Sequence, residues 1–355
     1  MAREQGAADL ARTDLFAHGA NGLGGDQGHA SGGVRGEEQG RGGEGDGAGE
    51  RVAKTVPESG GGRVEVVAIF GPTASGKTAV AEAVAAVLAT EVVSVDALQV
   101  YRGLPILTNQ PATSTRLVGI RALTEQMTVG EFAPLAHAEI DGLVGEHGVA
   151  VVTGGTGLYL RAALADLDLP PAVAEETVAR VAGAVDADAA AAHVCLALLD
   201  PAAAAAVHPN DTQRLVRALS LAESGRTLAR ADDRLWSGET RRPSIVVGLE
   251  LSPEELDRRI AERARAMFGA GVVTEVRAAL EQPLSRTVEK TLGLREIASL
   301  PAEEALERLV ARTRRYARYQ RKWMRRIPGI VLVDGERAPE VVAAEVVMLA
   351  GLAAG

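Results

Sequence analysis

The stretch that decides the fold runs from residue 64 to residue 103 and reads VEVVAIFGPTASGKTAVAEAVAAVLATEVVSVDALQVYRG. It begins with a short apolar run rich in β-branched residues, which is typical of a buried strand, and it later enters an Ala-rich segment typical of a helix. The loop between them, from Gly71 to Thr78, matches the pattern G-x-x-x-x-G-K-[ST]. The stretch therefore predicts a strand, a phosphate-binding loop (P-loop) and a helix, in that order.

The loop brings charge as well as backbone donors. Its glycines let backbone N–H groups turn toward phosphate oxygens, and the helix that follows adds positive potential at its N-terminus. Lys77 supplies a point charge to a terminal phosphate, and the hydroxyl of Thr78 suits Mg²⁺. Loops of this kind usually hold ATP or GTP, but the pattern itself reports only a phosphate chain. We expect phosphate contacts from Gly71, Pro72, Thr73, Ala74, Ser75, Gly76, Lys77 and Thr78.

Further strands are expected to alternate with helices along the chain. EVVSVD (91–96), VAVVTGG (149–155) and SIVVGLEL (244–251) read as buried strands, and GIVLVDG (329–335) as a small final one. Long helices are expected after Pro253. These alternating segments predict an α/β fold, a parallel sheet flanked by helices, built from residues 63–171 and 241–355. Residues 172–240 are Ala-rich without a convincing strand, which predicts an all-helical insertion.

Residues 1–62 differ from the rest, since they hold 18 of the 40 glycines in the 355-residue chain. We expect this Gly-rich tail to be disordered, because it can bury almost no apolar surface. The net charge of −9 argues against a protein that coats nucleic acid or membranes through bulk charge, although a local basic patch is compatible with it. A single cysteine, Cys195, and the absence of a membrane-length apolar run predict a soluble cytoplasmic protein. A monomer is the default expectation.

Two strand ends carry polar residues that favour chemistry. Asp96 ends a predicted strand, where ligands of open α/β sheets collect, and its carboxylate could hold Mg²⁺ or act as a general base. A helix cap or turn residue is the alternative for this single aspartate. Thr156 follows a second glycine turn, Gly154-Gly155, and could cap a helix or donate to an anion.

Two helical segments carry clustered cations. In HPNDTQRLVRAL (208–219), Arg214 and Arg217 are spaced to share a helix face and could grip a phosphate backbone. Between Arg308 and Arg326 there are nine basic residues, no acidic one, and three interleaved aromatic side chains. This pattern favours a nucleic-acid surface, while a solvated helix with aromatics facing the core is the alternative.

Several functional classes fit the P-loop alone. A small-molecule kinase is the default, but a second acidic site and a set of lid arginines cannot be identified in the sequence. A regulatory binding module would leave Asp96 without a role. Neither class accounts for the basic and aromatic segment near the C-terminus.

The ordered set GPTASGKT, SVDALQVYRG, GGTGLYLRA, HPNDTQRLVRAL, RRIAERARAMFGAGVVTEV and TRRYARYQRKWMRR resembles the bacterial tRNA dimethylallyltransferases, the tRNA isopentenyltransferase family. The resemblance runs from Val64 to Val333. It implies that the P-loop holds the diphosphate of dimethylallyl diphosphate rather than ATP. It also implies transfer of the prenyl group to N6 of the adenosine immediately 3′ of the anticodon, on a base flipped into a channel beside the P-loop.

The resemblance assigns roles residue by residue. The expected catalytic residues are Asp96 as the general base, Thr156 and Lys77, and Mg²⁺ is expected at Thr78 and Asp96. Contacts with the tRNA anticodon stem-loop are expected from Asp96, Ala97, Leu98, Gln99, Thr156, Gln213, Arg214, Leu215, Val216, Arg217, Arg314, Arg318 and Trp323.

The chain departs from the family pattern at four positions. Ala97 replaces a serine, Gln110 a lysine, Thr115 a histidine and Gly119 an aspartate. These changes bear on details of substrate contact rather than on the reaction class. The nearest rival is a relative that prenylates free AMP. The helical insertion and the basic C-terminal segment favour tRNA.

Overall fold

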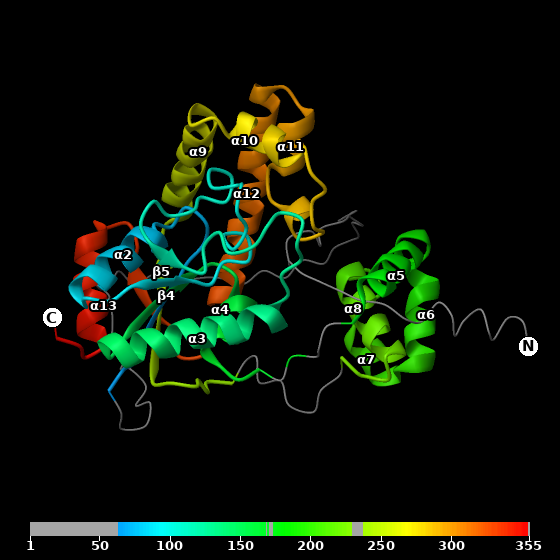
Figure 1. Cartoon of the computed structure of the whole chain (residues 1–355), viewed down its shortest axis with the longest axis horizontal. Helices are drawn as coiled ribbons and strands as arrows, with labels where there is room; N and C mark the ends of the chain where they lie inside the picture. The colour runs from blue at the N-terminus through cyan, green and yellow to red at the C-terminus, as the bar shows by residue number, and fades with distance from the viewer. Residues whose placement is uncertain (1–62, 168, 170–172, 229–236, 354–355) are drawn as a thin grey trace, which may run out of the picture.

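A six-stranded, wholly parallel sheet forms the centre of the molecule, with the strand order β3-β2-β4-β1-β5-β6 (Figure 1). The structure is a computed structural model that describes residues 63–167, 169, 173–228 and 237–353. The strands are β1 (Val66–Phe70), β2 (Val92–Ser94), β3 (Thr115–Arg116), β4 (Ala150–Gly154), β5 (Ser244–Glu250) and β6 (Val331–Asp334). The predicted α/β class is therefore confirmed, and only the two-residue edge strand β3 was missed.

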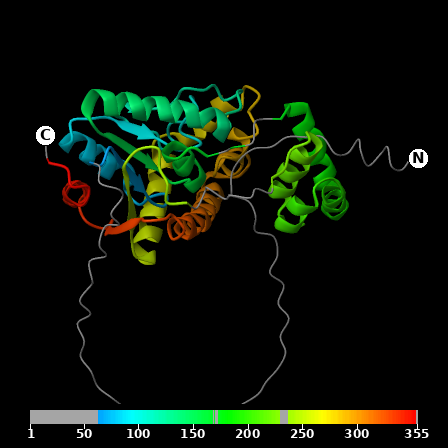
Figure 2. The same cartoon turned by 90° about the horizontal axis from the view of Figure 1, so that it is seen from below.

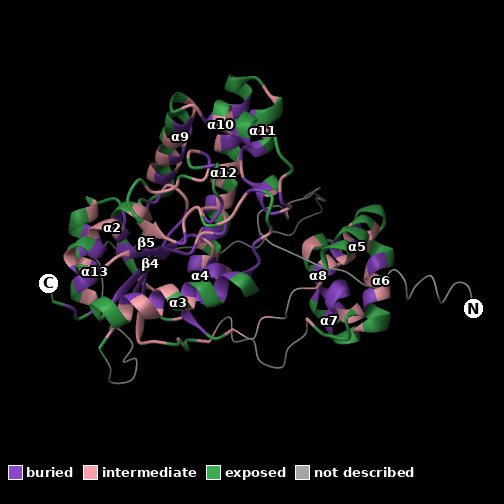
Figure 3. Ribbon diagram, viewed as in Figure 1, coloured by how far each residue is buried: buried purple, intermediate pink, exposed green. Residues whose placement is uncertain are grey.

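Helices cover both faces of the sheet. On β1, Val66, Ala68 and Phe70 face one core while Val67 and Ile69 face the other. The first core is closed by α3 (Val129–His147) and α4 (Gly157–Leu164), and the second by α2 (Lys77–Val87) and α13 (Pro339–Leu349). Figure 3 shows the buried residues concentrated along the sheet. Burial on both faces explains why these strands read as continuous apolar runs.

Four short helices form a separate unit between α4 and β5. They are α5 (Glu175–Ala187), α6 (Ala189–Leu199), α7 (Pro201–Ala206) and α8 (Thr212–Glu223). They pack around their own core, which includes Val181, Leu196 and Leu215, and both views show them beside the sheet domain (Figures 1 and 2). Aspartates cap three of them, as Asp211 does by accepting from the backbone N–H of Arg214 at 3.1 Å. The described residues of 172–240 thus contain helices and no strand.

A layer of helices rises over the sheet at the end where the P-loop lies (Figure 1). The segment 254–280, expected to be helical, forms α9 (Pro253–Gly269) and α10 (Val272–Ala279), which are separated at Gly271 with a φ of +95°. After the 3₁₀ turn η2 (Val288–Lys290) and α11 (Leu294–Ser299), the long helix α12 (Ala302–Met324) packs along α9. These two helices deliver side chains to the P-loop.

Two further expectations concern the N-terminal tail and membrane-spanning helices. The predicted disordered tail, residues 1–62, lies outside the described residues. Within the described part of the chain, none of the helices combines the length and the apolar character needed to cross a membrane.

Candidate active site

The P-loop follows β1 and wraps the start of α2. Its backbone passes through left-handed conformations at Ala74 and Gly76, and the N–H of Ser75 donates to the carbonyl of Pro72 at 3.1 Å. Gly76 is the N-cap of α2, and no described side chain caps that helix. The first N–H groups of α2 therefore have no side-chain cap within the described residues, which suits the binding of an anion there. The phosphate contacts of the loop stay a prediction.

The ends of β2 and β4 bring the second group of polar residues beside this loop. Asp96 follows β2, and its Oδ1 accepts from the backbone N–H of Leu98 at 2.9 Å. Gly154 ends β4 so close to β2 that an added Cβ would lie 2.8 Å from the carbonyl oxygen of Val95. Thr156 is the N-cap residue of α4, but its side chain makes no capping hydrogen bond to the described helix. Instead its hydroxyl lies 3.4 Å from that of Tyr316 and lines the pocket.

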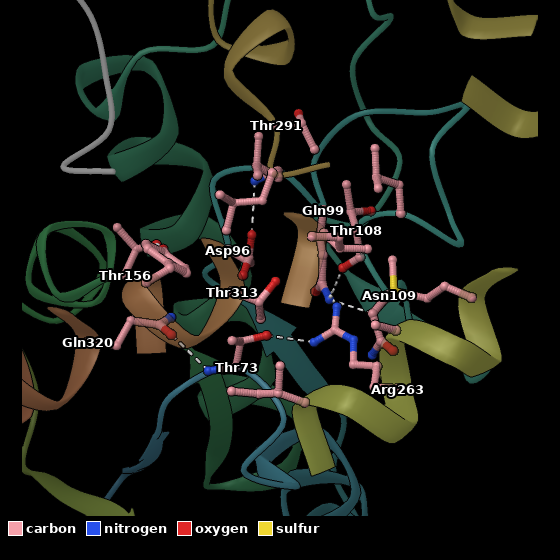
Figure 4. A pocket seen from close by; sticks show the side chains of 18 of the residues that line it. Thr73, Asp96, Gln99, Thr108, Asn109, Thr156, Arg263, Thr291, Thr313 and Gln320 are labelled. Atoms are coloured by element: carbon pink, nitrogen blue, oxygen red, sulfur yellow. Dashed lines mark hydrogen bonds between the residues drawn. The ribbon is translucent and has the colours of Figure 1, made fainter. Parts of the chain in front are cut away.

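Two arginines of α9 donate hydrogen bonds to the P-loop. Arg259 donates through Nη1 to the carbonyl of Ser75 at 3.3 Å, and Arg263 donates through Nη1 to the hydroxyl of Thr73 at 2.6 Å (Figure 4). Since the two arginines are four residues apart, they lie on the same face of the helix. Nε of Arg263 is buried without a hydrogen-bond partner among the described residues, and the side chain lines the pocket. Arg263 is therefore a candidate anion ligand that the sequence analysis did not identify.

Helix α12 reaches the same loop with a buried glutamine. The amide oxygen of Gln320 accepts from the backbone N–H of Thr73 at 2.7 Å, and its amide nitrogen donates to the carbonyl of Gly155 at 2.8 Å (Figure 4). One helical turn earlier, Tyr316 lines the pocket beside Thr156. The alternative weighed for the basic segment, that its aromatics face inward, thus holds for this tyrosine.

The pocket concentrates opposite charges in a desolvated space. Burial lowers the pKa of Lys77 from 10.5 to about 8; Asp96 opposes this shift and Arg263 reinforces it. Burial likewise lowers the pKa of Arg263, against the attraction of Asp96, and raises the pKa of Tyr316. Asp96 is thus the shared anionic partner of Lys77 and Arg263. Two cations thus face a single carboxylate, and a bound anion would supply the negative charge that balances the second cation.

The pocket brings together half of the predicted site residues of the transferase core, eight of sixteen. Of the predicted set, it is lined by Thr73, Lys77, Thr78, Asp96, Ala97, Leu98, Gln99 and Thr156. Beyond these polar groups lies an apolar wall with contributions from Leu107, Met267 and Leu309, all nearly fully buried. Unpredicted polar lining comes from Thr108, Asn109, Arg263, Thr291, Thr313, Tyr316 and Gln320. The only sequence signal for Arg263 was its place in the motif RRIAERARAMFGAGVVTEV, and that for Gln320 was its place in TRRYARYQRKWMRR.

Gln99 lines the pocket, but its amide is engaged within the protein. Its Oε1 accepts from the hydroxyl of Ser94 at 2.8 Å, and its Nε2 donates to the carbonyl of Asn109 at 2.7 Å. Gln110, one of the departures from the family pattern, donates to the carbonyl of Tyr101 at 2.7 Å. Both glutamines therefore hold the loop that forms one wall of the pocket.

The structure corrects the expected accessibility of the α8 segment. Arg214 is exposed, whereas Leu215 is buried in the core of the helical unit and Arg217 is also buried. The predicted shared face of Arg214 and Arg217 is therefore not an open cationic face, because only Arg214 reaches solvent. Gln213 and Val216 are partly exposed, and their contact with RNA stays a prediction.

Two of the three residues of α12 that were predicted to contact RNA also make contacts within the protein, and their contact with RNA stays a prediction. Arg314 forms an ion pair with Asp257 of α9 at 3.1 Å. Trp323 packs on the first turn of α4, where a Cβ added to Gly157 would lie 2.1 Å from its ring. Arg318 does face solvent, together with Arg315, Lys322 and Arg325 at helical spacing. We call these four residues the basic stripe; none of them forms an ion pair within the described residues.

The fold and the pocket together place this protein among the P-loop enzymes. Comparison with known proteins agrees. Residues 99–327 match a family model described as IPP transferase, and residues 64–123 match one described as isopentenyl transferase. The tRNA dimethylallyltransferase of Anaeromyxobacter dehalogenans (strain 2CP-C) is 38% identical over 300 residues, which cover 80% of this chain and 99% of that protein.

Other relatives agree with this comparison. The tRNA dimethylallyltransferase of Salinispora tropica is 37% identical over 76% of this chain and 88% of its own length. Among solved structures, the tRNA isopentenylpyrophosphate transferase from Bacillus halodurans shares 27% identity with a TM-score of 0.57, covering 81% of this chain and 97% of that one. The chain belongs to the tRNA dimethylallyltransferase family.

Proposed function

We propose that this protein transfers the dimethylallyl group of dimethylallyl diphosphate to tRNA and releases diphosphate. The acceptor is N6 of the adenosine immediately 3′ of the anticodon, and the protein acts as a monomer in the cytoplasm, where its substrate is found. Family membership supports the reaction class. The observation that carries the proposal is a single pocket in which a P-loop, a carboxylate and an apolar wall meet.

The phosphate end of the pocket suits a leaving diphosphate. As the allylic C–O bond breaks, negative charge develops on the departing oxygen and a delocalised cation forms on carbon. The N–H groups at the start of α2, the ammonium of Lys77 and the guanidinium of Arg263 stabilise the developing negative charge. The apolar wall beyond, with Leu107, Met267 and Leu309, accommodates the five-carbon group and keeps water from the cation.

The donor atoms in the pocket also fit Mg²⁺. Thr78 and Asp96 both present oxygen to the same space, and no cluster of three acidic, histidine or cysteine side chains exists among the described residues. Mg²⁺ is commonly held by one or two protein oxygens together with substrate phosphates, which matches this sparse donor set. When bound, the ion would neutralise diphosphate charge. Thr78 and Asp96 are the residues that would hold it.

Asp96 also offers a carboxylate that can serve the acceptor. An adenine amine is a weak nucleophile, so catalysis depends on holding it in line with the breaking bond. A carboxylate at the edge of the diphosphate site can take the proton that the amine loses as the new C–N bond forms. The base must leave its stack to enter the pocket, at a cost of a few kcal/mol.

The basic stripe supplies a surface for the RNA backbone. Its four cations lie on the solvent side of α12, whereas Tyr316 and Gln320 on the same helix face the pocket. Helix α12 thus joins the active site to a cationic exterior in an otherwise acidic chain. Such contacts give affinity that falls with salt and carries little sequence information.

The test is a competition of donors and acceptors. The protein is incubated with Mg²⁺ and either labelled dimethylallyl diphosphate or γ-labelled ATP. The acceptors are an unmodified tRNA transcript, the same transcript with guanosine 3′ of the anticodon, and AMP. We expect label only from the prenyl donor and only in the first transcript. Transfer to AMP, or label moving from ATP, would overturn the proposal.

A further inference from the structure

Gln320 makes a connection that the proposed chemistry does not use. It is 3% exposed, and its amide joins two loops from different strands, the P-loop after β1 and the glycine turn after β4. The turn fits tightly against it, because a Cβ added to Gly155 would lie 2.4 Å from the amide nitrogen of Gln320. One side chain therefore joins the loops at two of the strand ends that supply the pocket, those of β1 and β4.

The chemistry of the two contacts calls for a primary amide. Thr73 N–H can only donate and the carbonyl of Gly155 can only accept, so the bridge needs an acceptor and a donor on one planar group. Glutamate offers an acceptor to Thr73 but sets a second oxygen against the carbonyl of Gly155. Methionine fills a similar volume and offers neither bond.

The loops joined in this way carry opposite halves of the reaction. Thr73 is held on its other side by Arg263, which donates to its hydroxyl at 2.6 Å, so the P-loop is fixed from both α9 and α12. Gly155 precedes Thr156, whose hydroxyl lies in the pocket 3.4 Å from that of Tyr316. Because the backbone N–H of Thr73 donates to Gln320, this N–H fixes the position of the P-loop and is not free to bind a phosphate.

We propose that Gln320 is a positioning residue that fixes the P-loop relative to the Thr156 turn, and so sets the register between the leaving diphosphate and the acceptor side of the pocket. This inference rests on the proposed function. Displacements of about 1 Å in such an arrangement can cost about 100-fold in rate. The loss should fall on the rate of transfer more than on binding, since neither bond of Gln320 is one that the substrate needs.

The test compares Gln320→Met and Gln320→Glu with wild type and with Glu307→Gln, an exposed substitution on the same helix. Inorganic pyrophosphate binding, measured by calorimetry with Mg²⁺, gives both an affinity and the fraction of competent sites. Single-turnover transfer from dimethylallyl diphosphate to saturating tRNA gives the rate per competent site. We expect Gln320→Met to retain close to one site per chain and to transfer about 100-fold more slowly. We expect Glu307→Gln to match wild type.

Two results would overturn the inference. One is a transfer rate per competent site in Gln320→Met that lies within about threefold of wild type. The other is a loss of the total transfer rate that is fully explained by the loss of pyrophosphate-binding sites, because such a loss would mean that Gln320 has a purely structural role. If Gln320→Met does not fold, Gln320→Glu is judged by the same two criteria. Should neither variant fold, the rate of Gly155→Ala decides, since its methyl group would press on the same amide; a rate per site equal to wild type would refute the role. A wild-type protein that transfers no prenyl group would instead refute the proposed function.

Discussion

The packing of Trp323 on Gly157 allows a quantitative test of how α12 is seated. In Gly157→Ala the new methyl carbon would lie 2.1 Å from Cε3 of Trp323 and 2.8 Å from two further ring atoms. An ordinary carbon contact is about 3.5 Å, so the ring or α4 must retreat by roughly 1.4 Å. Overpacking of this kind costs about 1–3 kcal/mol, and replacing a helical glycine returns about 0.5–1 kcal/mol. The difference spans about 0–2.5 kcal/mol, and the very short contact of Gly157 places our expectation in its upper part, a net loss of about 1–2 kcal/mol.

The assay is thermal and urea unfolding of four variants beside wild type: Gly157→Ala, Gly142→Ala, Trp323→Leu and the double variant Trp323→Leu/Gly157→Ala. A loss of that size should lower the melting midpoint by about 2–8 °C. The matched control is Gly142→Ala, also within a helix, where an added Cβ meets nothing within 4 Å. This control should be stabilised by about 0.5–1 kcal/mol. In a Trp323→Leu background the Gly157→Ala cost should shrink by about 1 kcal/mol, because the clash partner is gone. An unchanged midpoint in Gly157→Ala, or the same cost in both backgrounds, would refute the packing argument.

The remaining predictions concern charge and the chain ends. Asp96→Ala should lower turnover by about 10²–10⁴-fold while tRNA affinity, measured by filter binding, stays within a few-fold; near-normal turnover would remove Asp96 from the mechanism. Because the pKa of Lys77 lies at about 8, its charge is present below that pH and lost above it, so pyrophosphate affinity should fall as the pH rises through 8. Lys77→Arg, titrated alongside, should lack this component, and Asp96→Asn should move it to lower pH. Replacing Arg318 and Lys322 of the basic stripe by Gln should reduce the slope of log affinity against log salt by about 1.4–1.8 without changing the melting midpoint; an unchanged slope would argue against backbone contacts there. Removing residues 1–60 should leave the activity and the melting midpoint unaltered. A fall in either would contradict the prediction that this tail is disordered.

Local pattern was sufficient for the sheet and the phosphate cradle. Strands buried on both faces leave long apolar runs, and the P-loop pattern specifies its own backbone geometry, so β1, β4, β5 and the loop after β1 could be predicted from short windows. The two-residue strand β3 could not, because its pairing depends on the neighbouring β2 rather than on its own composition.

Side-chain direction was the part that the sequence left undecided. Trp323 and Arg217 lie in segments whose composition suits RNA, yet Trp323 packs on Gly157 and Arg217 is buried. Gln320 stands within a basic run and carries no charge of its own. Its partners are residues 247 and 165 positions away, so no local window could reveal them. The same holds for Arg263, which meets Thr73 across 190 positions.

The bond between Thr73 and Gln320 also bears on how the protein is made. The ribosome synthesises the P-loop well before α12, because the two partners are 247 positions apart. A nascent chain that stops before Ala302 carries β1 to β5 and the helical unit, but it lacks the helix that ties the two loops together. Ordering of the pocket must therefore wait until α12 has been synthesised, and closing so distant a contact is intrinsically slow. Prematurely released chains are thus expected to fold in part and to leave tRNA unmodified.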